Sequence, residues 1–400
     1  MPEGDQLRGK QVVFLSWRDT RNPEGGGAER YLESMAAGLV ERGASVTIFC
    51  AGHAAAPPDE VVDGVRFVRR GSKLSVYLQG MRALRRGELG RPDVVVDVQN
   101  GLPFFTRLVT RTPVVVLVHH VHREQWPVVY PGLTGRVGWF IERRVAPLLY
   151  RRSQYVAVSQ ATRGELQGLG VRGPRIAVVH NGTDPVVAVR PGKSPTPVVA
   201  VVGRLVPHKQ VEHAIDAVLS LRATHPQLRL HVVGGGWWEA RLHDYARVRG
   251  AGDAVVFEGH VDEARKHEIY EEAWVLALPS LKEGWGLVVG EAGMHGTPTV
   301  AYSDAGGTRE SVVDGLSGIL VPDRAGFAAA IGALLDDEET RERLGRGARV
   351  TSHAFTWGHA QESFAAVVTA VLQGRRVDAL DPGTSEQTEQ ADDVTGPEPL

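Results

Sequence analysis

Apolar residues in this chain occur mainly in short runs rich in valine, and longer stretches of helical period separate one run from the next. Residues 12–17 predict a buried strand, residues 29–43 a helix that ends at Gly43, and residues 45–50 a second strand, which together make one βαβ unit. Similar runs predict strands at 65–69, 93–98, 113–119, 155–159 and 176–181. Their nearly continuous apolar character is typical of parallel strands that are covered on both faces.

The alternation of predicted strands and helices is interrupted once and then resumes. Residues 184–197 contain four prolines and no helical period, so they predict a linker. Further strands are expected at 197–203, 229–235, 255–259, 274–280, 297–303 and 318–322, with helices at 211–224 and 239–249. The chain is therefore expected to be an α/β protein with two successive sheets. Residues 377–400 hold seven acids and no Lys or Arg, which predicts a disordered acidic tail.

The composition narrows the class of protein. The chain has 400 residues, more than one core usually organises, and its 42% hydrophobic and 23% charged content is that of a folded soluble protein. Its single cysteine, Cys50, excludes an internal disulfide framework and fits a reducing compartment. The N-terminus does not read as a signal peptide, and no apolar run predicts a membrane span, so we expect a cytoplasmic protein.

Charge is distributed unevenly between the two halves. Residues 1–184 carry 25 Lys and Arg against 17 Asp and Glu, whereas residues 185–400 carry 20 against 30. The basic stretch 73–86 has apolar residues at helical spacing beside several arginines. It is read either as an ordinary surface helix with a basic edge, which we favour, or as a helix that contacts a membrane surface. Peripheral contact with the inner face of the membrane through the basic N-terminal domain thus stays open.

The segment from Leu276 to Ala301 carries the most chemical information. It predicts a strand, then a loop with Glu283 and two glycines, and then a helix that starts near Gly286 and contains Glu291. The free backbone N–H groups at the start of that helix, from Gly286 through Leu287 to Val288, can receive an anion such as a phosphate. The two carboxylates would then bond sugar or ribose hydroxyls, unless they are incidental acids on a capped helix.

A second segment places two cations after a strand. The strand at 197–203 runs into Gly203 and Arg204, and Lys209 follows near the start of a helix. Open α/β sheets bind ligands at the carboxyl ends of their strands. Arg and Lys there suit a diphosphate, although a pair of ordinary surface charges is the alternative.

Two loops in the first half of the chain contain further candidate binding residues. Residues 22–30 place three glycines between the first strand and its helix, where backbone can approach a ligand or form only a tight turn. His119 ends the strand predicted at 113–119, and His120 and His122 come directly after it. Their spacing matches no strong metal-ligand pattern, so we expect no metal.

In this order and spacing, these segments resemble those of retaining glycosyltransferases of family 4. The resemblance covers about residues 11–374, and its most specific element is the pair of glutamates eight positions apart in EGWGLVVGE, Glu283 and Glu291. Secondary matches are GGGAE, YVAVSQAT, VHNGTD, GRLVPHK, VVGGG, VVFEGHV and DAGGTRE. The resemblance implies the GT-B fold, in which two Rossmann-like domains with mostly parallel sheets face each other across a cleft. The domains would be 1–184, on the acceptor side, and 185–357, which binds the nucleotide sugar, with a helix at about 358–374 packing back on the first.

The same resemblance implies roles for individual residues. Arg204 and Lys209 would stabilise the departing diphosphate, Glu283 would hold donor-sugar hydroxyls, and His119 would lie against the transferred sugar. Glu291 would bind the ribose diol. The remaining donor contacts would come from Gly203, Gly234, Glu258, His260, Val261, Gly286, Leu287 and Val288, and the acceptor side would use Gly26, Gly27 and Trp126.

The reaction implied is metal-independent hexosyl transfer with retention, without a permanently bound cofactor. The donor would be a nucleotide-diphosphate sugar and the acceptor a saccharide, a lipid or a natural product; no nucleic acid partner is expected. Two alternatives stay open at this point. One is a nucleotide-sugar epimerase or a phosphorylase on the same frame, and the other is a two-lobed binding protein without catalysis.

Overall fold

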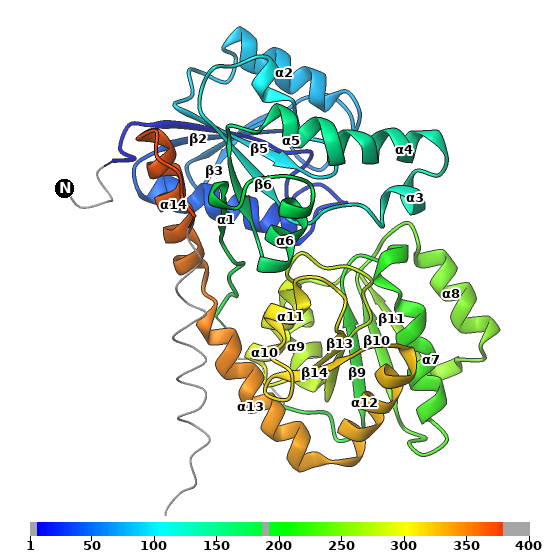
Figure 1. Cartoon of the computed structure of the whole chain (residues 1–400). Helices are drawn as coiled ribbons and strands as arrows, with labels where there is room; N and C mark the ends of the chain where they lie inside the picture. The colour runs from blue at the N-terminus through cyan, green and yellow to red at the C-terminus, as the bar shows by residue number, and fades with distance from the viewer. Residues whose placement is uncertain (1–5, 186–191, 379–400) are drawn as a thin grey trace, which may run out of the picture. The chain divides into compact units, whose positions relative to one another are not determined.

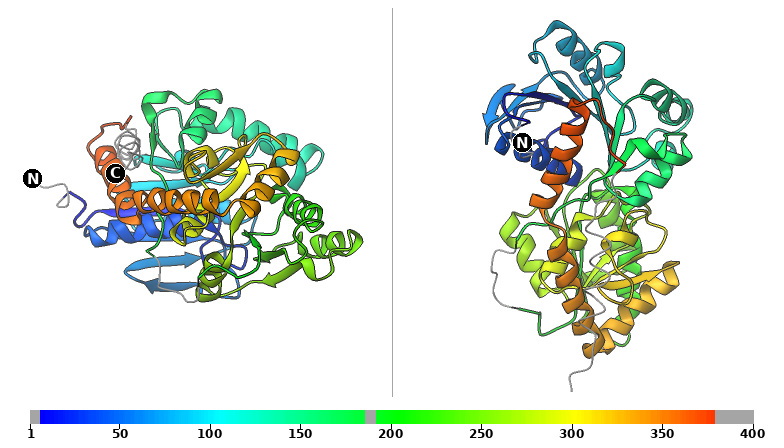
Figure 2. Two further views of the ribbon diagram at one scale, coloured as in Figure 1. Left: turned by 90° about the horizontal axis from the view of Figure 1, so that it is seen from below. Right: turned by 60° about the vertical axis from the view of Figure 1, so that its left-hand side comes forward.

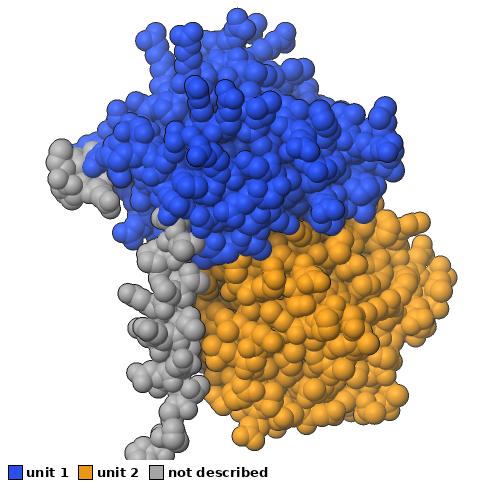
Figure 3. Space-filling view, viewed as in Figure 1, with its two compact units in different colours: residues 1–180, 358–400 blue, residues 181–357 orange. Residues whose placement is uncertain are grey.

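The computed structural model describes residues 6–185 and 192–378 (Figure 1). The chain forms two compact units, residues 1–180 with 358–400 and residues 181–357 (Figure 3). The expected linker lies partly, and the acidic tail almost wholly, outside the described residues. The expected α/β class is confirmed, because each unit contains a mainly parallel sheet with helices.

Unit 1 contains an eight-stranded sheet in the order β3-β4-β2-β1-β5-β6-β7-β8. Its strands are β1 (Gln11–Leu15), β2 (Ser45–Cys50), β3 (Asp59–Val62), β4 (Val65–Arg69), β5 (Val94–Gln99), β6 (Val114–Val118), β7 (Gln154–Ala157) and β8 (Ile176–Val178). Its helical elements are α1 (Gly27–Glu41), α2 (Val76–Arg86), η2 (Thr106–Leu108), α3 (Trp126–Val129), α4 (Leu133–Phe140), η3 (Ile141–Val145), α5 (Ala146–Leu149), α6 (Gln160–Gly168) and η4 (Gly173–Arg175).

One strand of this sheet was not predicted. The short strand β3 pairs antiparallel with β4, whereas the other pairs in the sheet are parallel. Asp63 and Gly64 connect the two strands with φ angles of +48° and +79°. An Asp-Gly pair with positive φ at both positions is the usual two-residue hairpin turn. The residue pattern did not predict this hairpin, because β3 is mostly exposed and lacks a continuous apolar run.

The last described helix, α14 (Trp357–Leu372), packs on unit 1 although it follows unit 2 in the chain (Figure 2). The ring of Phe364 stacks on Phe14 of β1 with centroids 6.0 Å apart. The amide nitrogen of Gln361 donates to the carbonyl oxygen of Ser34 at 3.1 Å. Unit 1 is therefore built from both ends of the chain.

Unit 2 contains a six-stranded sheet in the order β11-β10-β9-β12-β13-β14. Its strands are β9 (Val198–Val202), β10 (Arg229–Val233), β11 (Val255–Gly259), β12 (Val275–Leu278), β13 (Thr299–Tyr302) and β14 (Gly318–Val321). Its helical elements are η5 (Pro207–Lys209), α7 (Val211–Leu221), α8 (Glu239–Val248), η6 (Gly252–Ala254), α9 (Glu263–Glu272), α10 (Leu287–Met294), α11 (Thr308–Ser311), α12 (Arg324–Asp336) and α13 (Glu338–Ala354).

Both faces of this sheet are buried. Val199 and Val201 of β9 belong to one core cluster, which includes residues of α7, α8 and α12. Val198, Ala200 and Val202 belong to another, which includes residues of α9 and α10. Successive side chains of a strand point to opposite faces, so a strand between two helical layers must be apolar throughout. This explains why valine runs, rather than alternating patterns, marked the strands.

Candidate active site

A pocket in unit 2 lies at the carboxyl ends of β9 and β12. These strands are neighbours in the sheet although they are not consecutive in the chain, which makes this the topological switch point. Open α/β sheets bind ligands in the crevice at such a point. Arg204, Lys209 and Ser280 line the pocket beside apolar residues of the strand ends. The pocket therefore offers two cations where a ligand is expected to bind.

Two glycines follow β9 and β10 directly, at the carboxyl edge of the sheet. Gly203 and Gly234 have φ angles of +149° and +118°. The N–H of Gly203 donates to Val233 O at 3.0 Å, and the N–H of Gly234 donates to Gly259 O at 2.8 Å. A Cβ on Gly234 would lie only 2.1 Å from the carbonyl oxygen of Gly203. Close packing of three strand ends therefore requires Gly234, whether or not a ligand also touches it.

Lys209 and Glu283 form an ion pair beside the pocket. The Nζ of Lys209 donates to Oε1 of Glu283 at 2.5 Å. Burial raises the pKa of the Glu283 carboxyl, but the charge and hydrogen bond of Lys209 outweigh burial, and the net effect is a lowered pKa. Glu283 is thus ionised at neutral pH, with Lys209 as its counter-ion. An anion entering the pocket would compete with Glu283 for that ammonium group.

The turn that carries Glu283 is held by the loop after β13. The N–H of Glu283 donates to Ala305 O at 2.9 Å, and the N–H of Gly307 donates to Glu283 O at 3.0 Å. A Cβ on Gly307 would lie 2.0 Å from the carbonyl oxygen of Gly284. The motif DAGGTRE therefore acts as a support for the Glu283 turn, since only glycine allows the two loops to approach this closely.

Helix α10 begins directly after that turn. Gly286 is its N-cap at φ +93°, and Leu287 is its first residue. The backbone N–H groups of the first turn, which include those of Leu287 and Val288, lack carbonyl partners within the helix, so they are suited to an anion. The side chain of Val288 packs against the apolar cores. Only the backbone of this segment is therefore available to a polar ligand.

Glu291 lies one turn further along α10, and helix α9 occupies both of its carboxylate oxygens. Lys266 Nζ donates to Oε1 at 3.3 Å, and the hydroxyl of Tyr270 donates to Oε2 at 2.7 Å. Burial, reinforced by the charge of Glu291, raises the pKa of Tyr270 well above its usual value, so the hydroxyl keeps its proton. Sequence analysis missed Lys266 and Tyr270. The available signal was their spacing of four residues, which places them on one side of a helix.

At the end of β11, mainly backbone groups are available to contact a ligand. The carboxylate of Glu258 lies 2.7 Å from His231 Nδ1 and accepts from Arg265 at 3.3 Å. His260 is exposed, and Val261 is partly buried against the core. This segment therefore has the character expected for backbone contacts, because the Glu258 side chain is already engaged.

In unit 1 the glycine loop leads into helix α1. Gly26 is the N-cap and Gly27 the first residue of that helix. The N–H of Gly26 donates to Oε2 of Glu29 at 2.8 Å, and Oε1 of Glu29 accepts from Arg18 Nε at 2.8 Å. Arg18 and Glu29 are both buried, with 3% of each side chain exposed. This ion pair fixes the conformation of the loop.

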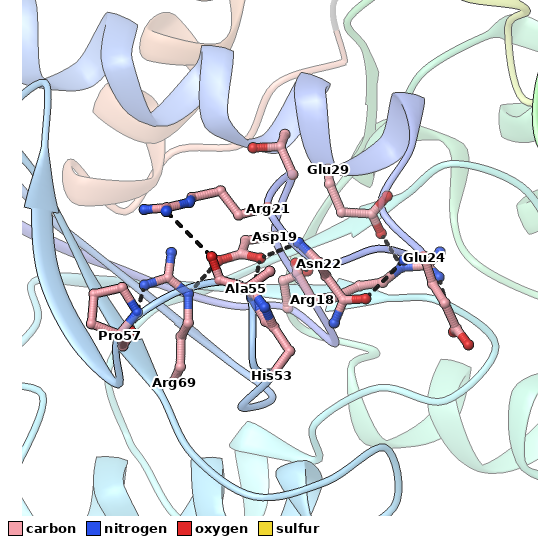
Figure 4. Close-up of polar contacts among 12 residues, drawn as sticks. Arg18, Asp19, Arg21, Asn22, Glu24, Glu29, His53, Ala55, Pro57 and Arg69 are labelled. Carbon is pink, nitrogen blue, oxygen red and sulfur yellow. Dashed lines mark hydrogen bonds and ion pairs between the residues drawn. The ribbon is translucent and has the colours of Figure 1, made fainter. Parts of the chain in front are cut away.

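A buried network around Asp19 holds the rest of the loop (Figure 4). The Asp19 carboxylate accepts from Arg69 Nε at 2.5 Å and from the N–H of Asn22 at 3.0 Å, and it lies 2.9 Å from His53 Nε2. Arg69 also donates to the carbonyl oxygen of Pro57 at 2.9 Å. Asp19 is fully buried. No motif in the sequence indicated this network, because its members come from separate loops and strands.

His119 follows β6 and is buried. Its ring meets Tyr31 of α1 edge-on, with centroids 5.3 Å apart. Burial, with the charge of His122, lowers the pKa of His119 to about 4, so the imidazole is neutral at pH 7. Among the described residues, its Nε2 has no hydrogen-bond partner. A neutral ring nitrogen with this vacancy can bond a ligand hydroxyl.

Trp126 lies in the interior of unit 1. It is 9% exposed, and its indole N–H donates to Glu142 Oε2 at 2.6 Å. The other Glu142 oxygen lies 3.2 Å from His122 Nδ1, and His122 Nε2 lies 2.8 Å from Asn100. In unit 1 the Trp126 ring is thus packed and its polar group is already bonded, and its contact with an acceptor stays a prediction.

Comparisons with known proteins agree with this geometry. Residues 25–187 match the family model described as Glycosyltransferase Family 4, and residues 188–351 match that of group 1 glycosyl transferases. The glycogen synthase of Mycobacterium tuberculosis is 30% identical over 396 residues, which cover 88% of this chain and 92% of the relative. The chain belongs to glycosyltransferase family 4.

Other relatives of this family 4 glycosyltransferase carry different names. The D-inositol 3-phosphate glycosyltransferase of Xylanimonas cellulosilytica is 28% identical over 421 residues, covering 88% of this chain and 95% of that protein. The sucrose-phosphate synthase of Thermosynechococcus elongatus matches in structure with a TM-score of 0.75 at 20% identity, covering 91% and 98% of the two chains. Anabaena HepE, solved with UDP-glucose, gives a TM-score of 0.69 at 21% identity, covering 90% and 99%.

These matches confirm the expected family and the GT-B fold. The protein is a glycosyltransferase enzyme, and the pocket at the switch point lies in the unit that matches the group 1 glycosyl transferase model.

Proposed function

We propose that the protein transfers a hexose from a uridine-diphosphate sugar to a hydroxyl acceptor, with retention and without a metal ion. The single observation that carries the proposal is the pocket at the β9–β12 switch point, lined by Arg204 and Lys209. Solved relatives of the same fold with UDP or UDP-glucose bound support the choice of uridine diphosphate.

The chemistry follows from where charge develops. The bond between the anomeric carbon and a diphosphate oxygen breaks, so positive charge builds on the sugar and negative charge on the diphosphate. Arg204 and Lys209 would stabilise that negative charge more strongly in the transition state than in the ground state. The new bond joins the anomeric carbon to the acceptor oxygen, and the hydroxyl proton passes to the departing diphosphate on the same face.

The remaining residues would position the donor. Lys209 would leave Glu283 for the phosphate, which frees Glu283 to accept hydrogen bonds from sugar hydroxyls. Glu291, oriented by Lys266 and Tyr270, would accept from the ribose diol. The neutral His119 would bond a hydroxyl of the transferred sugar through Nε2. The N–H groups at the start of α10 would complete the phosphate contacts.

For the acceptor we propose a hydroxyl-bearing saccharide or polyol. The support is the names of full-length relatives, a glycogen synthase and a D-inositol 3-phosphate glycosyltransferase, whose acceptors are carbohydrates or polyols. Lipid and natural-product acceptors lack such support.

One assay tests the proposal. Purified protein is incubated with UDP-, ADP- and GDP-glucose, each with and without a panel of saccharides and polyols. We expect UDP release that depends on an acceptor, persists in EDTA and gives a product with the donor's anomeric configuration by NMR. Epimerised donor without transfer would establish the rival enzyme, and binding without UDP release would establish a non-catalytic protein.

A further inference from the structure

A long basic helix on unit 1 leaves its outer apolar face uncovered. Helix α4, the π-helix η3 and helix α5 follow one another without a break from Leu133 to Leu149. The exposed large apolar side chains along it are Leu133 (74%), Val137 (49%), Phe140 (60%) and Leu148 (67%). Helix α3 contacts α4 and adds the exposed Val128 and Val129. We call this set the apolar stripe.

The opposite face of the same helix is firmly packed. Gly135, Gly138, Glu142 and Ala146 are buried. A Cβ on Gly138 would lie 2.3 Å from the ring of Trp126. The helix is therefore anchored through its inner face, and the apolar stripe is a fixed surface rather than a loosely attached segment.

The exposed charges along the helix are all positive. Residues 131–152 contain five arginines, all exposed: Arg136, Arg143, Arg144, Arg151 and Arg152. The one acid in this range, Glu142, is buried and bonded to Trp126 and His122. The exposed side of this helix is thus apolar and basic, with no acidic residue.

We propose that this face docks on an anionic lipid surface, with the apolar stripe in the headgroup region and the arginines against lipid phosphates. A helix that combines exposed large apolar residues with a basic flank binds in the plane of a membrane interface. A polyanion such as a nucleic acid would use the arginines but leave the apolar stripe in water. A second copy of the chain would bring two arginine-rich faces together, which like charges oppose.

This location differs from the stretch 73–86 that the sequence suggested. Of the apolar residues in that stretch, Leu74 and Leu78 are exposed, at 77% and 65%. Val76, Ala83 and Leu84 are buried in the core of unit 1, which makes α2 mainly an ordinary packed helix. None of the described helices is both long and apolar enough to cross a bilayer. The proposal is therefore for surface contact through α4, η3 and α5.

Vesicle sedimentation with the full chain tests the proposal independently of sugar transfer. The probes are vesicles of phosphatidylcholine alone and of phosphatidylcholine with one-third phosphatidylglycerol. We expect binding to the anionic vesicles at least about tenfold tighter than to the neutral ones, weakened by 0.5 M NaCl. The Leu133→Ser/Phe140→Ser variant should lose most of this binding. Arg136→Glu/Arg144→Glu should lose at least about 25-fold, since each arginine near the surface contributes roughly fivefold.

Two variants act as matched controls. Leu74→Ser/Leu78→Ser removes exposed apolar residues from the α2 region, and Val248→Ser/Val350→Ser removes them from unit 2, where these side chains are 76% and 57% exposed. Both should bind as the unchanged protein does. Equal binding to both vesicle types, or binding that the α4 variants keep, would overturn the proposal. The proposal would also be overturned if the unchanged protein did not bind vesicles but self-associated, and if Leu133→Ser/Phe140→Ser abolished that self-association. Circular dichroism confirms that each variant is folded.

Discussion

The two units place charged side chains at comparable edges of comparable sheets, yet with opposite consequences. In unit 1, Asp19 and Arg69 at the strand ends are almost completely buried and bonded to each other. In unit 2, the Lys209 and Glu283 side chains keep 20% and 11% of their surface exposed, and Lys209 lines a pocket. In both ion pairs the nitrogen and oxygen lie 2.5 Å apart.

Burial decides whether such an ion pair serves stability or ligand binding. A buried pair has satisfied its charges against each other, and removing one member leaves an uncompensated charge in the interior. A pair at the wall of a pocket can exchange partners when an anion arrives. We therefore expect changes in unit 1 loop charges to affect stability, and changes in unit 2 loop charges to affect catalysis.

The largest effect should come from Asp19→Ala, which removes the fully buried carboxylate shared by Arg69, His53 and the N–H of Asn22. Among the described residues, Arg69 then keeps only the carboxylate of Glu60, which is partly exposed, as an ion-pair partner. We expect a loss of about 3–5 kcal/mol in the free energy of unfolding of unit 1. Guanidinium chloride unfolding followed by circular dichroism measures it. The control is Asp59→Ala, whose partners Arg66 and Arg70 keep 46% and 42% of their side chains exposed and which should cost at most about 1 kcal/mol. If the two variants lost the same free energy of unfolding, burial would not decide how much these ion pairs stabilise the protein.

Lys209→Ala should affect catalysis instead of stability. We expect kcat to fall by about 10²–10³-fold, the scale for loss of one preorganised charge stabiliser, while the melting temperature changes little. Lys10→Ala, which removes an exposed lysine of unit 1, is the control and should keep full turnover. Near-normal kcat of Lys209→Ala at saturating donor would reject its role at the leaving group.

A buried neutral histidine makes stability depend on pH. The pKa of His119 is lowered to about 4 in the folded protein, against about 6.5 for an ordinary histidine. The stability that this contributes is present above pH 6.5 and is lost as pH falls toward 4, by up to about 3 kcal/mol. Urea unfolding between pH 4 and 7 should show this loss, and His119→Asn should show a smaller one. An unchanged slope in the variant would mean that other groups cause it.

The smallest effect concerns Glu291. Glu291→Gln should raise the KM for the donor about tenfold, the scale of one hydrogen bond to a charged group, with kcat nearly unchanged. The effect should disappear with a 2′,3′-dideoxyribose donor, because the variant then has no hydroxyl contact left to lose. A full tenfold effect with that donor would show that Glu291 acts only by holding Lys266 and Tyr270 in place.

Much of the architecture was predictable because it depends on local pattern. Buried parallel strands must be apolar throughout, so valine runs located the predicted strands, whereas the exposed hairpin strand β3 lacked that signal. Arg204 and Lys209 were predictable as neighbours because both follow the carboxyl end of the strand predicted at 197–203.

The rest depended on contacts between distant segments. Asp19 meets Arg69 across 50 positions of sequence, and Trp126 packs closely against Gly138 and donates to Glu142. Exposure of Phe140 and Leu148 likewise follows from which side of the helix is packed, which the residue pattern alone did not reveal. Such facts arise from tertiary packing, and no spacing rule encodes them.

On the proposed function, the pocket at the β9–β12 switch point binds a diphosphate through Arg204 and Lys209. Isothermal titration of UDP and of uridine into the unchanged protein and into Arg204→Met/Lys209→Met measures this binding. We predict that UDP binds the unchanged protein far more tightly than uridine does, and that the double variant loses at least about a hundredfold of UDP affinity while its affinity for uridine changes little. Equal UDP affinity in the two proteins would contradict the claim.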